Sequence, residues 1–328
     1  MRRLVAPAIA AAVLALHPEA VRAEPLDVDL VRLGPPDEAV WLELVSTTGS
    51  PSITAGEAAT FASDAKKRFG ILSSEVALAI SGPLLQPAST TGHSGFDVAF
   101  EGGYSQVHGD AVGVVPPLGF SNEPWTTRSV TPGSLTTSGL HVRKALPFSF
   151  EMGGRITYLA KSSYFAAQGE AKWALNEGFE YIPDLAVRVA YTRLFGQREW
   201  NLDATDVDFM VSKRWGVQGV TSFTPYLAAR FTFVSASTDK LDFGPYRAAP
   251  GGPVDQNRTV AGFPKLRTGL YRTTLGVRMT AYVVSLAAEA TYFGGKSYSG
   301  EAAPNRDQYP DFELDSSFSA AVKLGWEF

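Results

Sequence analysis

The chain ends on Ser317-Phe318-Ser319-Ala320-Ala321-Val322-Lys323-Leu324-Gly325-Trp326-Glu327-Phe328, a stretch that alternates without a break. Its even-numbered positions are all apolar, and most of its odd-numbered positions are polar or small. Successive side chains of a β-strand point to opposite faces, so this period of two predicts a strand with one apolar face. The strand runs to an aromatic residue at the last position of the chain.

The same period of two recurs upstream, in runs that are each about one strand long. Their apolar positions include Phe148, Phe150, Met152, Ile156 and Tyr158; Phe165, Ala171 and Trp173; Leu185, Val187, Val189 and Tyr191; Val207, Phe209 and Val211; Leu227, Phe231 and Phe233; Leu275, Val277 and Met279; and Val284, Leu286 and Tyr292. Weaker runs lie at 95–107 and 139–146. Residues 95–328 therefore predict an all-β fold, a closed antiparallel transmembrane barrel of about ten strands, with twelve as the alternative.

The connections between these runs alternate in length. Short links near Pro147, near Pro183, at 217–222 and at 282–283 alternate with longer ones at 108–138, 195–202, 236–266 and 294–315; the link at 162–163 is a short exception. Outer-membrane barrels have short periplasmic turns and longer external loops. Aromatic residues near strand ends suit a lipid headgroup zone, and the candidates for such a girdle are Trp173, Trp215, Tyr271, Tyr292 and Trp326. A soluble β-sandwich is the alternative reading of the alternation.

The composition and the N-terminal residues indicate where the protein is located. The 328 residues include no Cys and carry a formal charge of −4, which excludes disulfide scaffolds and thiolate sites and disfavours nucleic acid as a partner. Residues 1–23 have a basic start, an apolar stretch at Leu4–Leu16, and Ala23 before a cleavage site, as in a secretory signal peptide that is removed. We expect an exported protein in the outer membrane.

The C-terminal pattern resembles that of bacterial outer-membrane β-barrels. In that superfamily the final strand closes on Phe and is read by the barrel-insertion machinery, which assigns Trp326 and Phe328 here as the assembly signal. More closely, the runs Gly95–Val98, Leu140–Phe148 and Leu324–Phe328 resemble an uncharacterised group of small proteobacterial outer-membrane proteins. This resemblance implies a fold and a location, with outer-membrane lipid and the insertion machinery as partners, and it implies no activity.

Residues 24–94 do not alternate and form a separate N-terminal segment. Thr54-Ala55-Gly56-Glu57 has the spacing of a capping box, which predicts a helix over about 54–69 that ends at Gly70, and a second short helix over 73–80. We expect these helices to dock on the periplasmic rim, with a plug inside the bore as the alternative.

The polar faces of the strands predict a charged lumen. Its acids are Glu101, Glu151, Glu170, Asp206, Asp208 and Glu289, with Asp97 beside them; its bases are Arg143, Arg155, Lys172, Arg188, Arg230, Arg272 and Arg278, with Lys323 and Arg214 beside them. A barrel of eight to ten strands is narrow enough for side chains to fill it, so opposite charges should pair across the bore.

Motifs for catalysis or metal binding are weak. His108 and Asp110 follow the first strand and could lie at a rim, but an isolated His there is usually a loop residue. Asp203, Asp206 and Asp208 are spaced like metal ligands, but salt bridging explains them better. We therefore expect no enzyme, no metal and no cofactor.

The sequence predicts a narrow channel or conduit for a small polar or hydrophobic solute, with the apolar part of the 108–138 loop as a lid. The alternative is a structural or interaction barrel that transports nothing, and a rim hydrolase is a distant third. The solute and the oligomeric state are not determined by the sequence.

Overall fold

A computed structural model describes residues 24–48, 53–92, 94–108, 118, 120, 125, 133–217, 221–244, 259–298 and 309–328. The expected signal peptide at 1–23 lies outside the described residues. So do Asp110 and, within the expected lid, Val112, Val114 and Val115.

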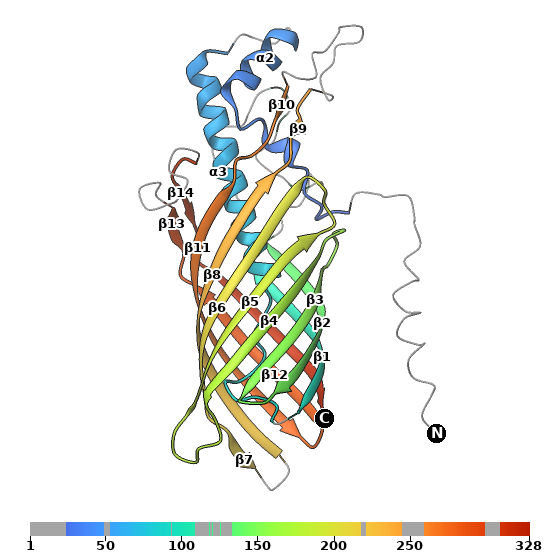
Figure 1. Ribbon diagram of the computed structural model, residues 1–328. Helices are drawn as coiled ribbons and strands as arrows, with labels where there is room; N and C mark the ends of the chain where they lie inside the picture. The colour runs from blue at the N-terminus through green and yellow to red at the C-terminus, as the bar shows by residue number, and fades with distance from the viewer. Residues whose placement is uncertain are drawn as a thin grey trace, which may run out of the picture.

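Ten strands form a closed antiparallel barrel, which confirms the predicted fold class and strand number (Figure 1). They are β1 (Phe96–Gln106), β2 (Ser134–Leu146), β3 (Phe150–Leu159), β4 (Phe165–Asn176), β5 (Asp184–Phe195), β6 (Trp200–Ser212), β8 (Thr221–Thr238), β11 (Leu266–Ala281), β12 (Val284–Phe293) and β15 (Ser317–Glu327). Each strand pairs with the next in chain order, and β15 pairs with β1 to close the sheet. A short strand, β7 (Trp215–Val217), adds to the end of β8.

The last residue takes part in this closure. The amide of Phe96 donates to the carbonyl of Phe328 at 2.9 Å, and the amide of Phe328 donates to the carbonyl of Phe96 at 2.8 Å. The C-terminal alternation is thus the final barrel strand, and its aromatic end is hydrogen-bonded to the start of the first strand.

The two ends of the barrel differ in the lengths of their connections, but the link predicted to be long at 195–202 spans only 196–199 in the structure. At one end lie the short turns at 147–149 and 282–283, the links at 177–183 and 213–220, and Phe328. We call this the short-turn end. The strand ends that flank the long connections 107–133, 239–265 and 294–316 lie at the other end, the cap end, together with the short links at 160–164 and 196–199.

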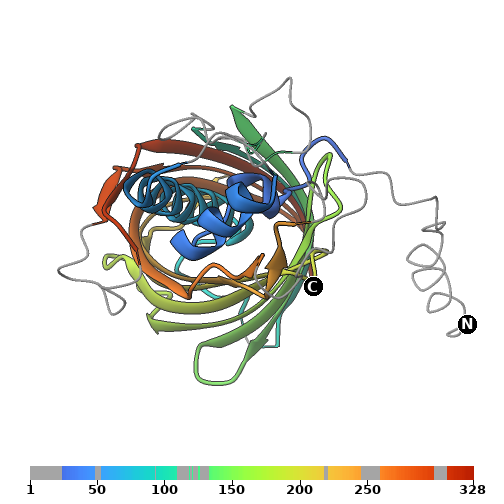
Figure 2. The same ribbon diagram turned by 90° about the horizontal axis from the view of Figure 1, so that it is seen from above.

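A folded cap covers the cap end of the barrel. It comprises the 3₁₀ helix η1 (Leu30–Leu33), α2 (Glu38–Thr48), the first turns of α3 (Ala55–Ile80), and two small sheets that pair β9 (Leu241–Asp242) with β10 (Val260–Ala261) and β13 (Lys296–Tyr298) with β14 (Phe312–Leu314). Viewed down the barrel axis, the helices lie over and within its mouth (Figure 2). In the described part of the chain, no helix is long and apolar enough to cross a bilayer.

The helix over 55–80 corrects one prediction. The capping box at Thr54 and Glu57 is present, but α3 continues through Gly70 to Ile80 as a single helix. A Cβ on Gly70 would lie 2.8 Å from the ring of Phe312. Gly70 therefore makes room for β14, and it does not end the helix. The prediction of two short helices was wrong because this glycine serves packing instead of termination.

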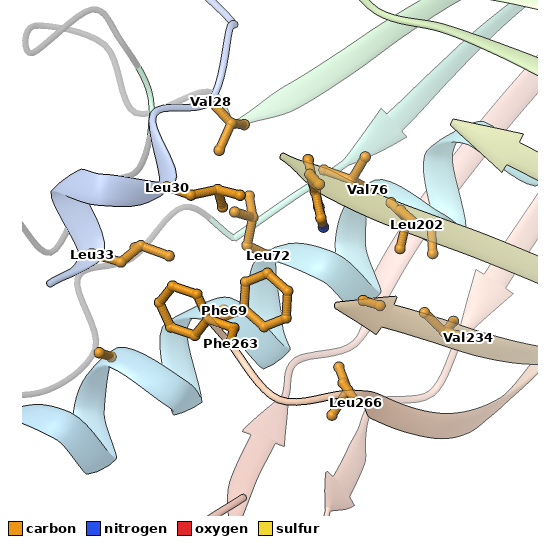
Figure 3. Packing of buried hydrophobic residues seen from close by; sticks show 14 of the residues in the cluster. Val28, Leu30, Leu33, Phe69, Leu72, Val76, Leu202, Val234, Phe263 and Leu266 are labelled. Atoms are coloured by element: carbon orange, nitrogen blue, oxygen red, sulfur yellow. The ribbon is translucent and has the colours of Figure 1, made fainter. Parts of the chain in front are cut away.

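The cap core is continuous with the upper interior of the barrel. Phe69 of α3 stacks on Phe263 with ring centroids 4.6 Å apart, and Leu72 and Val76 continue down the helix toward Leu202 of β6 (Figure 3). Burial in this apolar core lowers the pKa of Arg68 to about 10. The structure places the first turns of α3 at the cap end of the barrel and packs its later turns against the inner face of the strands.

Candidate functional site

The outer face of the barrel is apolar on every strand. Large exposed hydrophobic side chains include Phe100, Leu140, Ile156, Trp173, Val189, Phe209, Phe231, Leu275, Leu286 and Val322, one from each of the ten strands. Among the girdle candidates, Trp173, Trp215, Tyr271 and Tyr292 are all about half exposed. Water does not favour so large an apolar surface, whereas a bilayer does. The single closed sheet also replaces the alternative of a soluble sandwich.

The inner face carries the charges. The structure places all thirteen predicted lumen residues inside the barrel and buries them: Glu101, Arg143, Glu151, Arg155, Glu170, Lys172, Arg188, Asp206, Asp208, Arg230, Arg272, Arg278 and Glu289. Asp97 and Lys323 are buried with them, but Arg214 is exposed at the short-turn end and does not belong to this set. These charges are arranged in linked groups around the bore.

The first group joins β1, β2, β3, β4 and β15. Arg143 donates from Nε to Asp97 at 3.0 Å and pairs with Glu151 at 2.9 Å. Lys172 lies 3.4 Å from Glu151, and Lys323 lies 2.6 Å from Asp97. Each carboxylate is thus shared by two cations.

The second group centres on His141, which sequence analysis left without a role. Its ring lies between Glu101, at 2.9 Å from Nδ1, and Glu170, at 3.1 Å from Nε2. Arg155 pairs with Glu101 at 2.7 Å, and Arg188 pairs with Glu170. The alternation around Leu140 and Val142 turns His141 inward, and this was the signal that could have identified it.

The third group joins β5, β6, β8 and β11. Asp208 accepts from Arg188 at 2.6 Å and from Arg230 at 2.9 Å, and Asp206 accepts from Arg272 at 2.8 Å. These two carboxylates hold guanidinium groups, and the described residues contain no group of three acidic or histidine side chains placed to bind a metal. Asp203 lies apart from them, beside the hydroxyl of Tyr191.

An extended stretch of chain fills the space between these groups. Residues 81–92, which we call the plug segment, follow α3 down the bore and lead directly to β1 at the short-turn end (Figure 1). The segment Ser-Gly-Pro-Leu-Leu-Gln-Pro-Ala-Ser-Thr-Thr-Gly carries no charge. Its second residue, Gly82, has a φ of +70°, the left-handed conformation that glycine adopts freely, and a Cβ there would collide with Arg155.

Side chains of the barrel wall accept hydrogen bonds from the backbone amides of the plug segment. The amides of Leu84 and Leu85 donate to the two carboxylate oxygens of Glu289 at 2.8 and 2.7 Å. Farther down, the amide of Ala88 donates to Ser212 at 3.1 Å. The amides of Thr90 and Thr91 donate to Glu177 at 2.7 Å and Glu151 at 3.2 Å.

Cationic and amide side chains bind the carbonyls of the same stretch. Gln168 donates to the carbonyl of Ser81 at 2.7 Å, and Arg230 donates to that of Gly82 at 3.1 Å. Lys172 donates to the carbonyl of Ser89 at 3.0 Å. The wall charges therefore neutralise one another and, in addition, satisfy the main chain of the plug segment.

Small inward side chains make room for the plug. Leu84 and Ala88 pack in one buried cluster with Ala174, Ala186 and Ala228, which Met210 and Tyr226 complete. Gln86 is fully buried, and its amide bonds Glu170 at 3.2 Å and accepts from Lys172 at 3.0 Å. In the described upper bore, next to α3, the cavity has a volume of only about 20 Å³.

Of the two rim candidates, the structure describes only His108, which contacts α3. The amide of His108 donates to Glu75 of α3 at 2.7 Å, and its ring lies 3.8 Å from the same carboxylate. Of the expected lid, Phe120 and Trp125 are buried in the cap core. His108 thus connects the end of β1 to the helix.

No protein-family model matches the sequence, and no curated protein matches it. Solved structures that resemble it include Ail of Yersinia pestis (10% identity, 72% of this chain and 100% of that chain, TM-score 0.26), Neisserial surface protein A (12%, 71% and 95%, 0.28) and the translocator domain of the autotransporter NalP from Neisseria meningitidis (10%, 81% and 98%, 0.34).

This chain has the fold of a bacterial outer-membrane β-barrel. This conclusion rests on the closed sheet of ten strands, the apolar outer face and the buried polar interior. At such low identities and TM-scores, no activity is transferred from the similar structures. The bore of this barrel is occupied by the chain's own N-terminal segment.

Proposed function

We propose that this protein is a closed outer-membrane barrel that anchors a folded cap at the cell surface and transports nothing. One observation carries the proposal. The plug segment traverses the bore from the cap end to the short-turn end, and the wall binds its backbone at both ends and in the middle. A solute that passed through would have to displace a stretch of chain that shares the interior with paired charges.

The direction of the chain supports display at the surface. The cap lies at the end with the long connections, which are external in outer-membrane barrels. The chain therefore enters the bore from outside, descends through it, and starts β1 at the periplasmic end. The N-terminal residues 24–80 would then be presented outside the cell together with the long loops.

The filled bore favours this function over the solute channel. A charged bore open to water would leave the wall groups hydrated, but here their partners are one another and the plug backbone. Breaking such buried pairs is costly because each charge left behind has no compensation.

Epitope insertion tests the proposed display. One tag is placed between Glu24 and Pro25, and a matched tag is placed between Tyr181 and Ile182, in the exposed turn of the short-turn end. In intact cells the antibody should bind the Glu24 tag, whereas the Tyr181 tag should need permeabilised cells. The reverse pattern would contradict surface display.

Conductance tests closure separately. Refolded full-length protein in a planar bilayer should show no stable channel openings. Because the chain contains no Cys, the pair Ala88→Cys and Ser212→Cys can lock the plug to the wall as a control. Openings that vanish on oxidation and return on reduction would contradict a permanently closed bore.

A further inference from the structure

The N-terminal part of the cap lies at the opposite end of the bore from the start of the barrel. The helices η1 and α2 lie at the cap end, and the plug segment leads from α3 to β1, which starts at the short-turn end (Figure 1). In the orientation of the proposed function, on which this inference rests, the cap is outside the cell. The chain reaches the outer membrane from the periplasm, so its N-terminal segment must cross the membrane during assembly.

The N-terminal helices complete their core with side chains from the long connections. Trp41 of α2 packs edge to face on Phe120, with ring centroids 5.0 Å apart. Phe69 of α3 stacks on Phe263 at 4.6 Å. Phe120 and Phe263 belong to two different long connections, and both lie at the cap end. The helices therefore meet these partners after the crossing, and the segment crosses before its core has formed.

The wall of the bore binds main-chain atoms. Glu289, Ser212 and Glu151 accept from amides of the plug segment, and Arg230 and Lys172 donate to its carbonyls. Every residue carries a main-chain carbonyl, and every residue except proline carries a main-chain amide. Contacts of this kind suit an extended polypeptide of almost any sequence.

The bore is also wide enough for an extended chain. In its upper part it accommodates the last turns of α3, where Arg272 donates to the carbonyl of Leu78 at 3.3 Å and to the hydroxyl of Ser81 at 2.8 Å (Figure 2). A helix with its side chains is about 10–12 Å across, and an extended chain is narrower. The lower part holds the plug segment as an extended chain. Before the plug segment comes to rest, both parts admit a polypeptide.

We propose that the barrel is the export route of its own N-terminal segment. Residues 24–70 pass through the bore as an unfolded chain, and the last turns of α3 and the plug segment are the parts that remain inside. Folding of the cap makes the passage one-way, because return would expose Trp41 and Phe69, which are fully buried in the finished protein. The substrate of this export is a polypeptide, and the route is closed to solutes once the plug segment is in place.

Engineered disulfides test the route, because the chain contains no Cys. Ala59→Cys is exposed on α3 in the finished cap, about 30 Å along the helix axis from Ile80. Ser212→Cys faces the bore near the short-turn end, where Ser212 accepts from the amide of Ala88. These two cysteines are far apart in the finished protein. They meet when the N-terminal segment passes Ser212 inside the bore.

Val211→Cys is the matched control, because Val211 precedes Ser212 in β6 and points to the opposite face of the sheet. In cells treated with an oxidant, the pair Ala59→Cys and Ser212→Cys should form a reductant-sensitive cross-link about ten-fold more often than Ala59→Cys with Val211→Cys, because the bore confines the chain and raises its effective concentration. Non-reducing gels of the outer-membrane fraction measure this. The pair Ala88→Cys and Ser212→Cys defines complete cross-linking.

The Glu24 tag separates this inference from the display itself. Cross-linked molecules of the Ala59→Cys and Ser212→Cys variant should hide the tag in intact cells. If the tag of the cysteine-free protein is displayed, but both Ala59→Cys pairs cross-link equally or neither does, the segment does not travel through the bore and the inference is wrong. If that tag is not displayed at all, the orientation in the proposed function is wrong, and the inference falls with it.

Discussion

Glu289 is the wall residue on which the plug segment depends most directly. Its two carboxylate oxygens accept from the amides of Leu84 and Leu85, and the oxygen that meets Leu85 also accepts from the hydroxyl of Tyr226 at 2.8 Å. Glu289→Gln has nearly the same shape but replaces one oxygen by an NH₂ group. At least one buried donor then faces another donor.

The cost follows from that mismatch. A buried donor left without an acceptor destabilises a protein by about 1–3 kcal/mol. We therefore expect Glu289→Gln to lower the free energy of unfolding by about 1–3 kcal/mol. If the plug loosens locally, amide exchange at Leu84 and Leu85 should accelerate by about 5- to 140-fold, since 1.4 kcal/mol corresponds to a factor of ten.

Urea unfolding of the barrel in lipid vesicles, followed by fluorescence of its Trp residues, measures the first quantity, and hydrogen exchange measures the second. The matched control is Glu199→Gln, at an exposed position in the β5–β6 turn. A surface substitution of that kind changes stability by less than about 0.5 kcal/mol. If Glu289→Gln behaves like Glu199→Gln in both assays, the plug is not held by this carboxylate and the reasoning fails.

Three further predictions concern the lipid-facing surface of the barrel, the closure of its sheet and the cap. Val189→Lys places a charge on the lipid face and should reduce stability in lipid by about 2–4 kcal/mol, whereas Val189→Thr should cost much less; equal unfolding midpoints would contradict the strand register. Deletion of Phe328 removes its two hydrogen bonds to Phe96, where the sheet closes, and the aromatic end of the expected assembly signal; it should leave the protein periplasmic and protease-sensitive, so normal heat-modifiable mobility in the outer membrane would refute its role. Gly70→Ala forces the ring of Phe312 to move and should destabilise the cap by about 1–3 kcal/mol, while Gly56→Ala, with open space around it, should stabilise the same helix by about 0.5–1 kcal/mol; limited proteolysis of the cap measures both.

The barrel could be predicted because it depends on two local properties of the sequence, the alternation of side chains within each strand and the lengths of the connections. The side-chain period of two places Val189 outside and Arg188 inside, whichever residues lie across the bore. Connection lengths then place the long loops on one side. Neither property depends on contacts between distant parts of the chain.

The plug was not predictable in the same way because its partners come from the wall. Residues 81–92 have no period and no charge, and their hydrogen bonds end on Glu289, Gln168, Arg230 and other side chains far away in sequence. One indirect signal exists in the strands themselves. Inward alanines such as Ala174 and Ala186 leave space that a ten-strand barrel would otherwise fill with large side chains.

The helix α2 was also missed, for a local reason. Glu38–Thr48 mixes apolar and acidic residues without a clear helical stripe. Its start signal was present nevertheless: Pro35-Pro36-Asp37 ends on a residue whose side chain accepts from the amide of Ala39 at 2.8 Å. A helix N-cap after prolines is a recognisable pattern, but the helix that follows is only weakly amphipathic and was therefore not predicted.

The cap and the plug segment are held in place together because α3, which joins them, packs in one hydrophobic core with the barrel. Phe69, Leu72 and Val76 of α3 pack in the same cluster as Leu202 of β6 and Val234 of β8. The helix therefore cannot rise out of the mouth without exposing the upper barrel interior, and the plug segment below it cannot leave while the helix stays. Because β1 begins directly after the plug, the segment must already lie in the bore when β1 and β15 close the sheet. The closed bore is thus a consequence of how the chain is connected, and this connection is what makes a permanent anchor a better interpretation of the fold than a gate.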